Sequence, residues 1–330
     1  MSVKSELLEL FITEKGTYFS GEHIAERLHC SRTAVWKAVQ QLKEEGYEIT
    51  AVQNRGYALS EESDVLSREE ILHYLDKPYP LTVLQEVTST NDVLKAMANT
   101  QHAPEGTTIV SDYQTGGKGR LGRSFFSPKG TGLYVSMLLR PQDTVSNSLT
   151  LTAKAAVAVY RAVKTVCNVE LGIKWVNDLY LGHRKVCGIL SEGQASMESG
   201  HLDFVIAGIG INIYEPEGGF PEEIRQRAGS IMGQRTKEHQ INRNRLAAEV
   251  IREFYQLAAE PGLTSDYAKH NIVPGHEITV IDGDRRRPAK ALSILPDGRL
   301  EIQEADGSRN ALVFGEVSVR LRDGNQTIER

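Results

Sequence analysis

Hydrophobic residues recur at helical spacing in three segments of the first 46 residues. Residues 5–15 predict a helix that stops at Gly16, and a second helix is expected after Ser20. Ser31 stands where an N-cap belongs, and the third helix runs on to Gly46, the glycine expected beyond a helix C-terminus. The inward face of this helix follows an i, i+4, i+7 spacing through Val35, Val39 and Leu42.

An alternating pattern replaces the helical period after residue 46. The runs YEITAV and YAL flank QNRG, which predicts a β-hairpin with glycine in its turn. Three helices, the last two closely joined, followed by a hairpin are typical of a winged helix-turn-helix. We expect this domain to span residues 1–62.

Cations in this segment lie where a DNA-binding surface needs them. Residues 1–60 hold seven Lys/Arg and eight Asp/Glu, yet no acidic residue occurs between Ser31 and Leu42. A recognition helix with a basic wing draws most of its affinity from phosphate contacts. The alternative is a helical interaction module with a solvated basic face. We favour DNA binding, and the candidate residues are Ser31, Arg32, Thr33, Lys37 and Arg55.

The middle of the chain mixes strands and helices. Ser67 begins a capping-box pattern, and helices are expected from Asn91, over residues 150–166 and over residues 242–258. Several strand-like runs follow one another without a helix between them. This order favours a mixed α/β domain over residues 63–270 rather than a doubly wound one.

The tail of the chain predicts a further small domain. Short strands alternate with the turn sequences DGD, PDG and ADGS, which is typical of a β-barrel over residues 271–330. With 330 residues, two or three domains are expected. The predicted fold class is therefore α+β and multidomain.

A glycine-rich, cationic loop has the sequence QTGGKGRLGR, residues 114–123. It contains G-x-G-x-x-G, but a β-type run follows where a dinucleotide-binding turn must open a helix. A P-loop is excluded because glycine, not Ser or Thr, follows Lys118. Six of the 29 glycines lie between residues 116 and 132, so the backbone can approach an anionic ligand closely. We expect an anion-binding loop that is mobile when empty, in preference to a merely flexible basic hairpin.

Five motifs occur in one order along the chain. They are STN (89–91), the QTGGKGRLGR loop, KWVND (174–178), RKVCGIL (184–190) and GIGIN (208–212). In this combination the chain resembles bacterial biotin protein ligases of the bifunctional type, which also repress biotin synthesis genes. The resemblance covers essentially the whole chain. It implies a winged helix, a catalytic domain related to class II synthetases and lipoate ligases, and an SH3-like C-terminal barrel.

Three positions depart from the usual family pattern. Lys118 replaces an arginine, Phe125 stands where tryptophan is usual, and Val176 replaces a proline. A lysine keeps the charge but loses bidentate geometry, and phenylalanine keeps an aromatic face without the indole N–H. None of these changes removes a group that the chemistry requires.

The resemblance implies a two-step reaction. Biotin and ATP first form biotinyl-5′-AMP, and biotin then passes to a lysine of an acceptor such as the biotin carboxyl carrier protein of acetyl-CoA carboxylase. The first step joins two anions, so cations are needed around the transferring phosphorus. The candidates are Lys185, Arg120 and Lys118, with Mg²⁺ brought by the triphosphate. Without the motif, Lys185 would be read as a solvated lysine at a hairpin tip.

Further roles follow from the same resemblance. Biotin is assigned to Ser89, Thr90, Asn91 and Gln114, although Ser89 also fits a helix cap. Asn177 and Asn212 are assigned to the nucleotide, and Gly119 belongs to the ligand-binding loop. Asp178 is expected to orient the incoming lysine or to accept its proton, against the alternative of a simple turn residue. The stretch after Asn212 resembles the flap that the family places over adenosine.

Composition limits the remaining possibilities. A net charge of −5 argues against a protein that binds nucleic acid over its whole surface, so DNA binding must come from a local patch. The three cysteines, Cys30, Cys167 and Cys187, lack CxxC spacing and are interpreted as reduced, small hydrophobic residues, with no metal site. Without a cleavable apolar leader or a run of 18 apolar residues, we expect a cytoplasmic protein that does not enter the membrane.

The expected partners are operator DNA, the carrier protein and a second copy of the chain. We expect the adenylate to act as corepressor and to promote a homodimer by ordering the 114–132 loop. Two alternatives remain: a lipoate or octanoate ligase on the same scaffold, and a ligand-sensing winged-helix repressor without catalysis.

Overall fold

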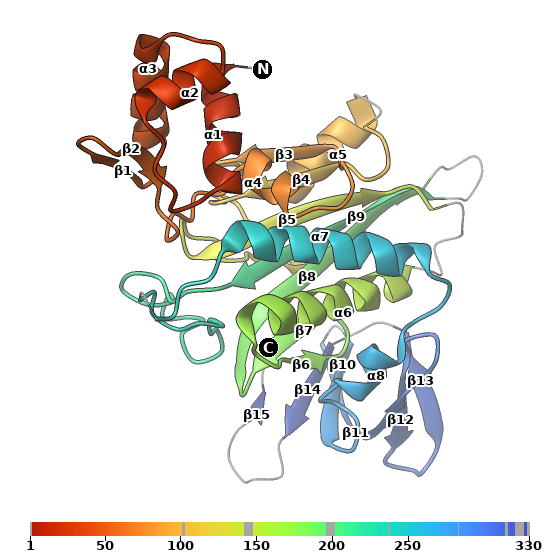
Figure 1. Cartoon of the computed structure of the whole chain (residues 1–330). Helices are drawn as coiled ribbons and strands as arrows, with labels where there is room; N and C mark the ends of the chain where they lie inside the picture. The colour runs from red at the N-terminus through yellow and green to blue at the C-terminus, as the bar shows by residue number, and fades with distance from the viewer. Residues whose placement is uncertain are drawn as a thin grey trace. The chain divides into compact units, whose positions relative to one another are not determined.

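The N-terminal residues form the three helices and the hairpin that their pattern predicts, as the computed structural model of the chain shows (Figure 1). The elements are α1 (Val3–Thr13), α2 (Gly21–Arg27), α3 (Arg32–Glu44), β1 (Ile49–Val52) and β2 (Gly56–Leu59). Ser31 caps α3, because its hydroxyl accepts a hydrogen bond from Ala34 N at 3.2 Å. The inward face of α3 is buried in one hydrophobic core with residues of α1. The winged helix-turn-helix prediction is confirmed.

The structure describes residues 2–100, 103–141, 148–195, 202–236, 238–282, 284–313, 316–320 and 327–328. The chain divides into two compact units. Unit 1 contains residues 1–78 and 240–248, and unit 2 contains residues 79–239 and 249–330. The predicted division into three domains is finer than these two units and stays a prediction.

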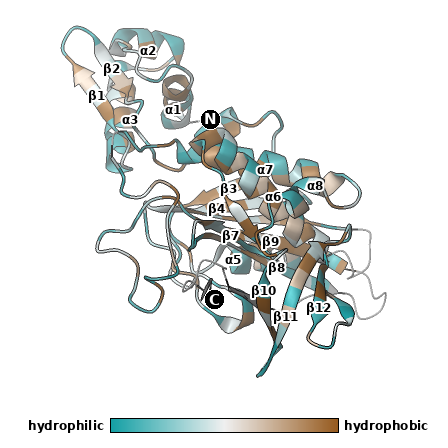
Figure 2. Cartoon of the chain, turned by 90° about the horizontal axis from the view of Figure 1, so that it is seen from below, coloured by the Kyte–Doolittle hydropathy of each residue, from teal (hydrophilic) through white to brown (hydrophobic). Residues whose placement is uncertain are grey.

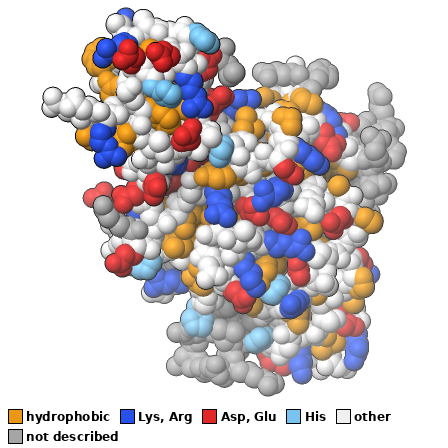
Figure 3. All heavy atoms as spheres, viewed as in Figure 1, with side chains coloured by type: hydrophobic (Ala, Val, Ile, Leu, Met, Phe, Trp, Pro, Cys, Tyr) orange, Lys and Arg blue, Asp and Glu red, His pale blue; other side chains and the backbone are white. Residues whose placement is uncertain are grey.

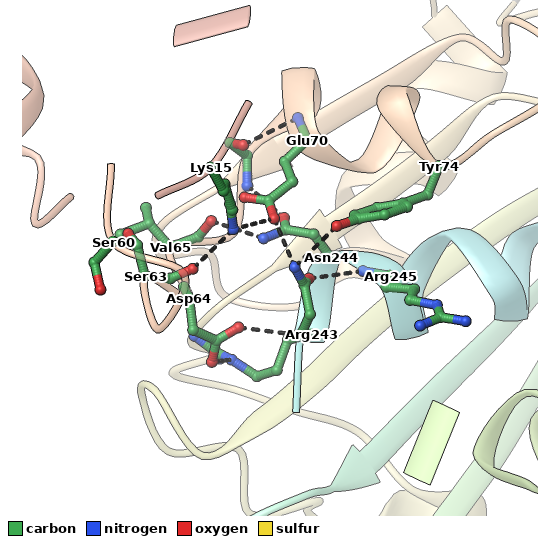
Figure 4. A network of polar contacts seen from close by, with 12 residues as sticks. Lys15, Ser60, Ser63, Asp64, Val65, Glu70, Tyr74, Arg243, Asn244 and Arg245 are labelled. Atoms are coloured by element: carbon green, nitrogen blue, oxygen red, sulfur yellow. Dashed lines mark hydrogen bonds and ion pairs between the residues drawn. The ribbon is translucent and has the colours of Figure 1, made fainter. Parts of the chain in front are cut away.

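Two distant segments of the chain meet inside unit 1 (Figure 4). The segment before α4 (Arg68–His73) lies against the first turns of α7 (Arg243–Ala259). Asp64 Oδ2 accepts a hydrogen bond from Arg243 Nε at 2.6 Å, and Asp64 Oδ1 accepts one from Arg243 N at 3.0 Å. Their side chains are only 2% and 4% exposed. This buried ion pair joins residues 179 positions apart.

Further polar contacts surround this pair. Asn244 Oδ1 accepts from Ser67 N at 2.9 Å, and Asn244 Nδ2 donates to Val65 O at 3.0 Å. Lys15 Nζ of unit 1 lies 2.6 Å from Glu70 Oε1. The first turns of α7 are therefore an integral part of the unit that carries the winged helix.

A seven-stranded mixed sheet forms the centre of unit 2. Its order is β3-β4-β5-β9-β8-β7-β6, with β3 parallel to β4 and all other neighbours antiparallel. The strands are β3 (Leu81–Leu84), β4 (Thr108–Ser111), β5 (Gly132–Leu139), β6 (Gly172–Lys174), β7 (Asp178–Leu181), β8 (Arg184–Ala195) and β9 (Leu202–Asn212). The prediction of a mixed domain is confirmed. Figure 2 shows hydrophobic residues concentrated on these strands.

Helices cover this sheet. They are α5 (Thr90–Thr100), α6 (Ser148–Cys167), the part of α7 from Glu249 onwards, and the short α8 (Ser265–Lys269). Arg161 of α6 pairs with Glu253 of α7 at 3.2 Å, and these two helices run side by side (Figure 1). Thr152 of α6 hydrogen bonds to Ser191 of β8 at 2.8 Å. Since alternate residues of a strand point to opposite faces, the neighbours Leu190 and Glu192 face away from α6.

The C-terminal strands correct one expectation. They are β10 (Glu277–Asp282), β11 (Arg285–Ile294), β12 (Leu300–Glu304), β13 (Arg309–Leu312), β14 (Glu316–Arg320) and β15 (Thr327–Ile328). The described strands pair in the open order β13-β12-β11-β10-β14-β15, and all pairs are antiparallel. A closed SH3-like barrel is therefore not confirmed, because no described pairing joins the two edge strands. Residues 314–315, 321–326 and 329–330 of this segment lie outside the described part.

Trp175 connects the two sheets of unit 2. It is buried, and its indole Nε1 donates a hydrogen bond to Gly298 O at 2.9 Å. Tyr267 of α8 donates to the neighbouring Val176 O at 3.0 Å. The tryptophan of the KWVND motif thus has a structural role, which the motif alone does not reveal.

On the face that Figure 3 shows, charged side chains of both signs are intermixed. In Figure 3 the Lys and Arg side chains alternate with Asp and Glu side chains, in keeping with the net charge of −5. None of the helices in the described ranges is long and apolar enough to cross a membrane.

Candidate functional site

Two adjoining cavities of unit 2 lie at the loops and strands that carry the five motifs. The larger has a volume of about 270 Å³ and the smaller about 50 Å³. Among the β8 and β9 residues that line the smaller cavity, Gly188, Leu190, Gly208 and Gly210 belong to the sheet face that points away from α6. Both cavities are lined by Gly119, Arg120, Phe125, Asn177 and Lys185. These shared residues mark a junction at which two ligands can meet.

The smaller cavity brings together the four residues predicted to bind biotin. Ser89, Thr90 and Asn91 are buried around the start of α5. Gln114 Oε1 accepts hydrogen bonds from Thr90 N at 2.9 Å and from Thr90 Oγ1 at 3.1 Å. Gln114 Nε2 donates to Ser127 Oγ at 2.9 Å, which fixes the orientation of the amide. Short polar groups with fixed directions suit a small ring that carries donors and acceptors.

Two residues that sequence reasoning missed hold Asn91 in place. Ser136 Oγ of β5 donates to Asn91 Oδ1 at 2.6 Å, and Asn91 Nδ2 donates to Glu192 Oε2 of β8 at 2.7 Å. Neither belongs to one of the five motifs, since Ser136 lies on β5 and Glu192 lies on β8 two residues beyond RKVCGIL. The one available signal is the alternation of strand residues, which places Ser136 and Glu192 on the face that carries Gly208.

Glycines of β8 and β9 make room for the loop above them. Gly188 and Gly210 are paired across these strands. A Cβ at Gly210 would overlap the ring of Phe125, and a Cβ at Gly208 would overlap the side chain of Asn91. The GIGIN motif therefore supplies a flat floor on which Phe125 and Asn91 rest.

The 114–123 loop is folded back on itself in this structure. Gly119 N donates to Arg123 O at 2.7 Å, and Phe125 N donates to Gly117 O at 2.8 Å. A short 3₁₀ turn, η1 (Arg120–Gly122), places Leu121 at the tip, where its side chain is 73% exposed. These contacts hold the cationic side chains of the loop above the cavities, in keeping with the anion-binding prediction.

The loop cations take different partners. Arg120 Nη1 donates to Asn177 Oδ1 at 3.0 Å, and Asn177 Nδ2 in turn donates to Ile189 O at 2.9 Å. Burial lowers the pKa of Arg120, which the nearby Asp178 partly offsets. Lys118 instead lies 2.6 Å from Asp92, and this hydrogen bond raises its pKa. The structure thus places Arg120 at the junction and Lys118 at the outer side of the smaller cavity.

The larger cavity is electropositive. Five cations line it: Arg120, Arg123, Lys174, Lys185 and Arg227. Asp178 is the one carboxylate among the described residues of its lining, and it forms an ion pair with Lys185 at 2.7 Å. A surplus of cations in a concave site favours a polyanion such as a triphosphate.

The segment after Asn212 covers this cavity. Asn212 Nδ2 donates to Gly229 O at 3.0 Å, and Lys185 N donates to Arg227 O at 2.7 Å. Phe220 of this segment and Phe126, three residues beyond the cationic loop, meet edge to face, with ring centroids 6.5 Å apart. These contacts place the predicted flap on the cavity, with apolar surface suited to a flat heterocycle.

The predicted DNA-binding residues lie on α3 and on the hairpin of unit 1. Arg32, Thr33 and Lys37 are exposed. Arg55 Cζ lies 4.3 Å from the centroid of the Tyr18 ring, which holds the arginine at the hairpin tip. Ser31 acts as the helix cap, so its hydroxyl is already used by Ala34 N.

Comparisons with known proteins agree with this geometry. A family model for the biotin/lipoate A/B protein ligase family matches residues 83–212, and a model for an HTH domain matches residues 3–58. The bifunctional ligase/repressor BirA of Bacillus subtilis is 38% identical over 236 residues, which are 70% of this chain and 71% of that protein. The namesake protein of Escherichia coli K12 is 31% identical over 316 residues, 92% of this chain and 94% of that protein.

A solved structure agrees as well. The biotin protein ligase of Aquifex aeolicus, in complex with biotin and ATP, has 28% sequence identity and a TM-score of 0.59. The match covers 73% of this chain and 98% of that one. Together with the matched catalytic and HTH segments, these similarities place the chain in one family. It belongs to the biotin/lipoate A/B protein ligases and, among them, to the bifunctional ligase/repressors.

Proposed function

We propose that the chain forms biotinyl-5′-AMP from biotin and ATP, transfers biotin to a lysine of a carrier protein, and represses transcription. One observation carries the catalytic part: a small polar cavity and a larger electropositive cavity meet at Arg120, Asn177 and Lys185. In this assignment biotin occupies the smaller cavity and the nucleotide the larger. The biotin carboxylate then meets the α-phosphate at the junction.

The first step joins two anions. A carboxylate oxygen of biotin attacks the α-phosphorus, the bond from that phosphorus to the bridging oxygen of the β-phosphate breaks, and diphosphate leaves. Lys185 and Arg120 lower the barrier by stabilising the charge that builds up on the phosphoryl oxygens. The Asp178 carboxylate, 2.7 Å from Lys185, holds the ammonium at the junction.

The second step moves the acyl group. The acceptor lysine nitrogen attacks the acyl carbon, the bond between that carbon and the phosphate oxygen breaks, and AMP leaves. The amine must lose a proton, and Asp178 is our candidate for orienting it or accepting that proton. The position of Asp178 in the lining of the larger cavity supports this role.

Magnesium enters this scheme with the nucleotide. The described residues contain no group of three or more His, Cys, Asp or Glu side chains that would hold a metal ion by themselves. The cavity lining offers Asp178 as a carboxylate, which is already paired with Lys185. Mg²⁺ would therefore be held mainly by phosphate oxygens, where it supplies charge neutralisation.

The repressor function is assigned to unit 1. The proposal includes operator DNA as its ligand, dimerisation promoted by the adenylate, the carrier protein of acetyl-CoA carboxylase as acceptor, and a cytoplasmic location. The exposed cations on α3 and the hairpin support the DNA assignment. A closed SH3-like barrel at residues 271–330 stays a prediction.

One experiment tests the ligase assignment. The protein is incubated with ATP, Mg²⁺ and either biotin, lipoate or octanoate, and the adenylate is identified by mass spectrometry. We expect biotinyl-AMP and diphosphate. Lipoyl- or octanoyl-AMP formed in preference to biotinyl-AMP would favour the alternative ligase. No adenylate at all, together with NADH binding, would favour a sensor without catalysis.

A further inference from the structure

One tryptophan of unit 1 lies on the surface of α3. Trp36 is 53% exposed, although the exposure of a large aromatic side chain to water is unfavourable and destabilises the folded protein. Its indole N–H makes no hydrogen bond to any residue that the structure describes. The other tryptophan of the chain, Trp175, is buried and hydrogen-bonded. Neither packing nor polar contacts within unit 1 therefore account for an indole at position 36.

The position of Trp36 on α3 is central to the outward face. Thr33, Trp36, Lys37 and Gln40 follow an i, i+3, i+4, i+7 spacing, which places them on one face. The opposite face is the buried one, with Val35, Val39 and Leu42 in the core. Trp36 thus points away from the core, beside the residues that we assign to DNA.

A groove runs between α3 and the β1–β2 hairpin. It has a volume of about 830 Å³, and its lining contains Arg32, Thr33 and Trp36 from α3 together with residues 51–54 of the hairpin. Glu22 balances Arg32 within the lining, while Lys37 and Arg55 are exposed on α3 and the hairpin. Cations around an apolar centre suit a ligand that has phosphates at its edges and uncharged groups in its middle. The DNA major groove is such a ligand, because phosphates border it and base edges form its floor.

We propose that Trp36 reads thymine in the operator, by apolar contact with the thymine 5-methyl group in the major groove. This inference rests on the proposed repressor function. The methyl group is the apolar feature by which the major-groove edge of an A·T pair differs from the others. Trp36 lies in the N-terminal half of α3, the part of a recognition helix that reaches base edges. Arg32, Lys37 and Arg55 would then contact phosphates, which position the helix without reading sequence.

The test begins by finding the DNA site with the full chain. A pool of random-sequence DNA duplexes is selected for binding in the presence of biotin, ATP and Mg²⁺, and the recovered sequences are aligned. Each thymine of the consensus is then replaced by deoxyuridine, which removes the 5-methyl group alone. The affinity of the native chain and of Trp36→Ala is measured for every duplex.

We expect at least one deoxyuridine substitution to weaken binding to the native chain by about fivefold, the smaller end of the effect of one base-pair change. Trp36→Ala should weaken binding to the thymine duplex and lose this discrimination. The matched control, Lys37→Ala, should weaken binding to both duplexes equally, as a phosphate contact does. Native-like hydrogen exchange of the α1–α3 amides in Trp36→Ala would establish that its winged helix is folded.

Two results would overturn the inference in different ways. If a consensus is recovered but no deoxyuridine effect depends on Trp36, the thymine contact is wrong while the repressor function stands. If no duplex is enriched over the pool, sequence-specific DNA binding itself is wrong, and the thymine contact falls with it.

Discussion

Lys185 Nζ lies 2.7 Å from Asp178 Oδ1, across the neighbouring strands β8 and β7 at the junction of the two cavities. Asp178 Oδ1 is buried and has no directed hydrogen bond in the described part of the chain, so the contact is chiefly electrostatic. The pair keeps a cation at the junction, where we propose that the two substrates meet.

Removing the Lys185 charge should stop adenylate formation. We expect Lys185→Ala to lower the rate of biotinyl-AMP formation by about 100-fold or more, the scale on which a single charge-stabilising donor contributes. The measurement is diphosphate release in the presence of biotin and ATP. Lys129→Ala, at an exposed lysine outside both cavities, is the control. A Lys185→Ala enzyme with the native rate would rule out the assignment.

Loss of Arg120 should affect retention of the intermediate more than its formation. Arg120→Gly removes the hydrogen bond to Asn177 and loosens the loop over both cavities. We expect free biotinyl-AMP in solution and labelling of lysines on unrelated proteins. Arg286→Gly serves as the control, since Arg286 is exposed on β11 and lines neither cavity. The prediction is wrong if the variant holds its intermediate as tightly as the native chain does.

Adding a single methyl group at Gly210 of β9, beneath Phe125, should impair substrate binding. A Cβ at Gly210 would overlap Phe125, so Gly210→Ala should displace the loop and raise the KM for ATP and biotin. Combining Gly210→Ala with Phe125→Ala removes the overlap. The double variant should therefore be less impaired than the sum of the two single changes predicts. Additive effects, measured by steady-state kinetics, would argue against a direct clash.

Removing one partner of the buried Asp64–Arg243 ion pair should destabilise unit 1 more than removing one partner of an exposed ion pair. Asp64→Ala leaves Arg243 buried without its carboxylate, and we expect a loss of about 3–5 kcal/mol in the stability of unit 1. The matched control is Glu14→Ala, which removes the exposed partner of Arg27 and should cost less than about 1 kcal/mol. Hydrogen exchange of α1–α3 amides measures both changes. Equal effects would contradict the prediction.

The cysteines should differ in reactivity. Burial raises the pKa of Cys167 to about 12 and also raises that of Cys187, whereas Cys30 is only partly buried. At pH 8 a thiol reagent should therefore modify Cys30 rapidly and the other two only after unfolding.

The raised pKa of Cys167 also makes the free energy of unfolding depend on pH. The folded pKa of Cys167 lies above its ordinary value near 9, so the unfolded chain releases this proton first. Its contribution to stability is complete below about pH 9 and is lost as pH rises towards 12, by at most ~1.4 kcal/mol per pH unit. Cys167→Ala should flatten the fall in urea midpoint between pH 9 and pH 10.5. An unchanged slope would show that Cys167 is accessible to solvent.

Local patterns predicted the elements that depend on nearby residues. The N-cap at Ser31 and the capping hydroxyl of Ser67, which accepts from Glu70 N at 3.2 Å, are present as expected. The four residues assigned to biotin line the smaller cavity. Gln114 meets Thr90 across 24 positions, a contact that no local pattern specifies, and the binding of biotin by these residues stays a prediction.

Contacts between distant segments were beyond the reach of local patterns. Ser136 and Glu192 meet Asn91 only through the sheet order, in which β5 and β8 flank β9. The role of Arg243 depends on a partner 179 residues away. The tail strands were found, but barrel closure depends on pairing between sheet edges, which alternation along one strand does not specify.

The division of unit 1 between two distant stretches has a consequence for the order of synthesis. Asp64 leaves the ribosome 179 residues before Arg243, an interval of roughly 10–40 s at ordinary elongation rates. During that time the winged helix has been made but cannot complete its buried ion pair, while all seven strands of the central sheet are added. A chain interrupted before residue 243 therefore lacks part of its N-terminal unit. In such a chain Asp64 has no Arg243 to pair with, so we expect its N-terminal unit to be less stable than that of the finished chain.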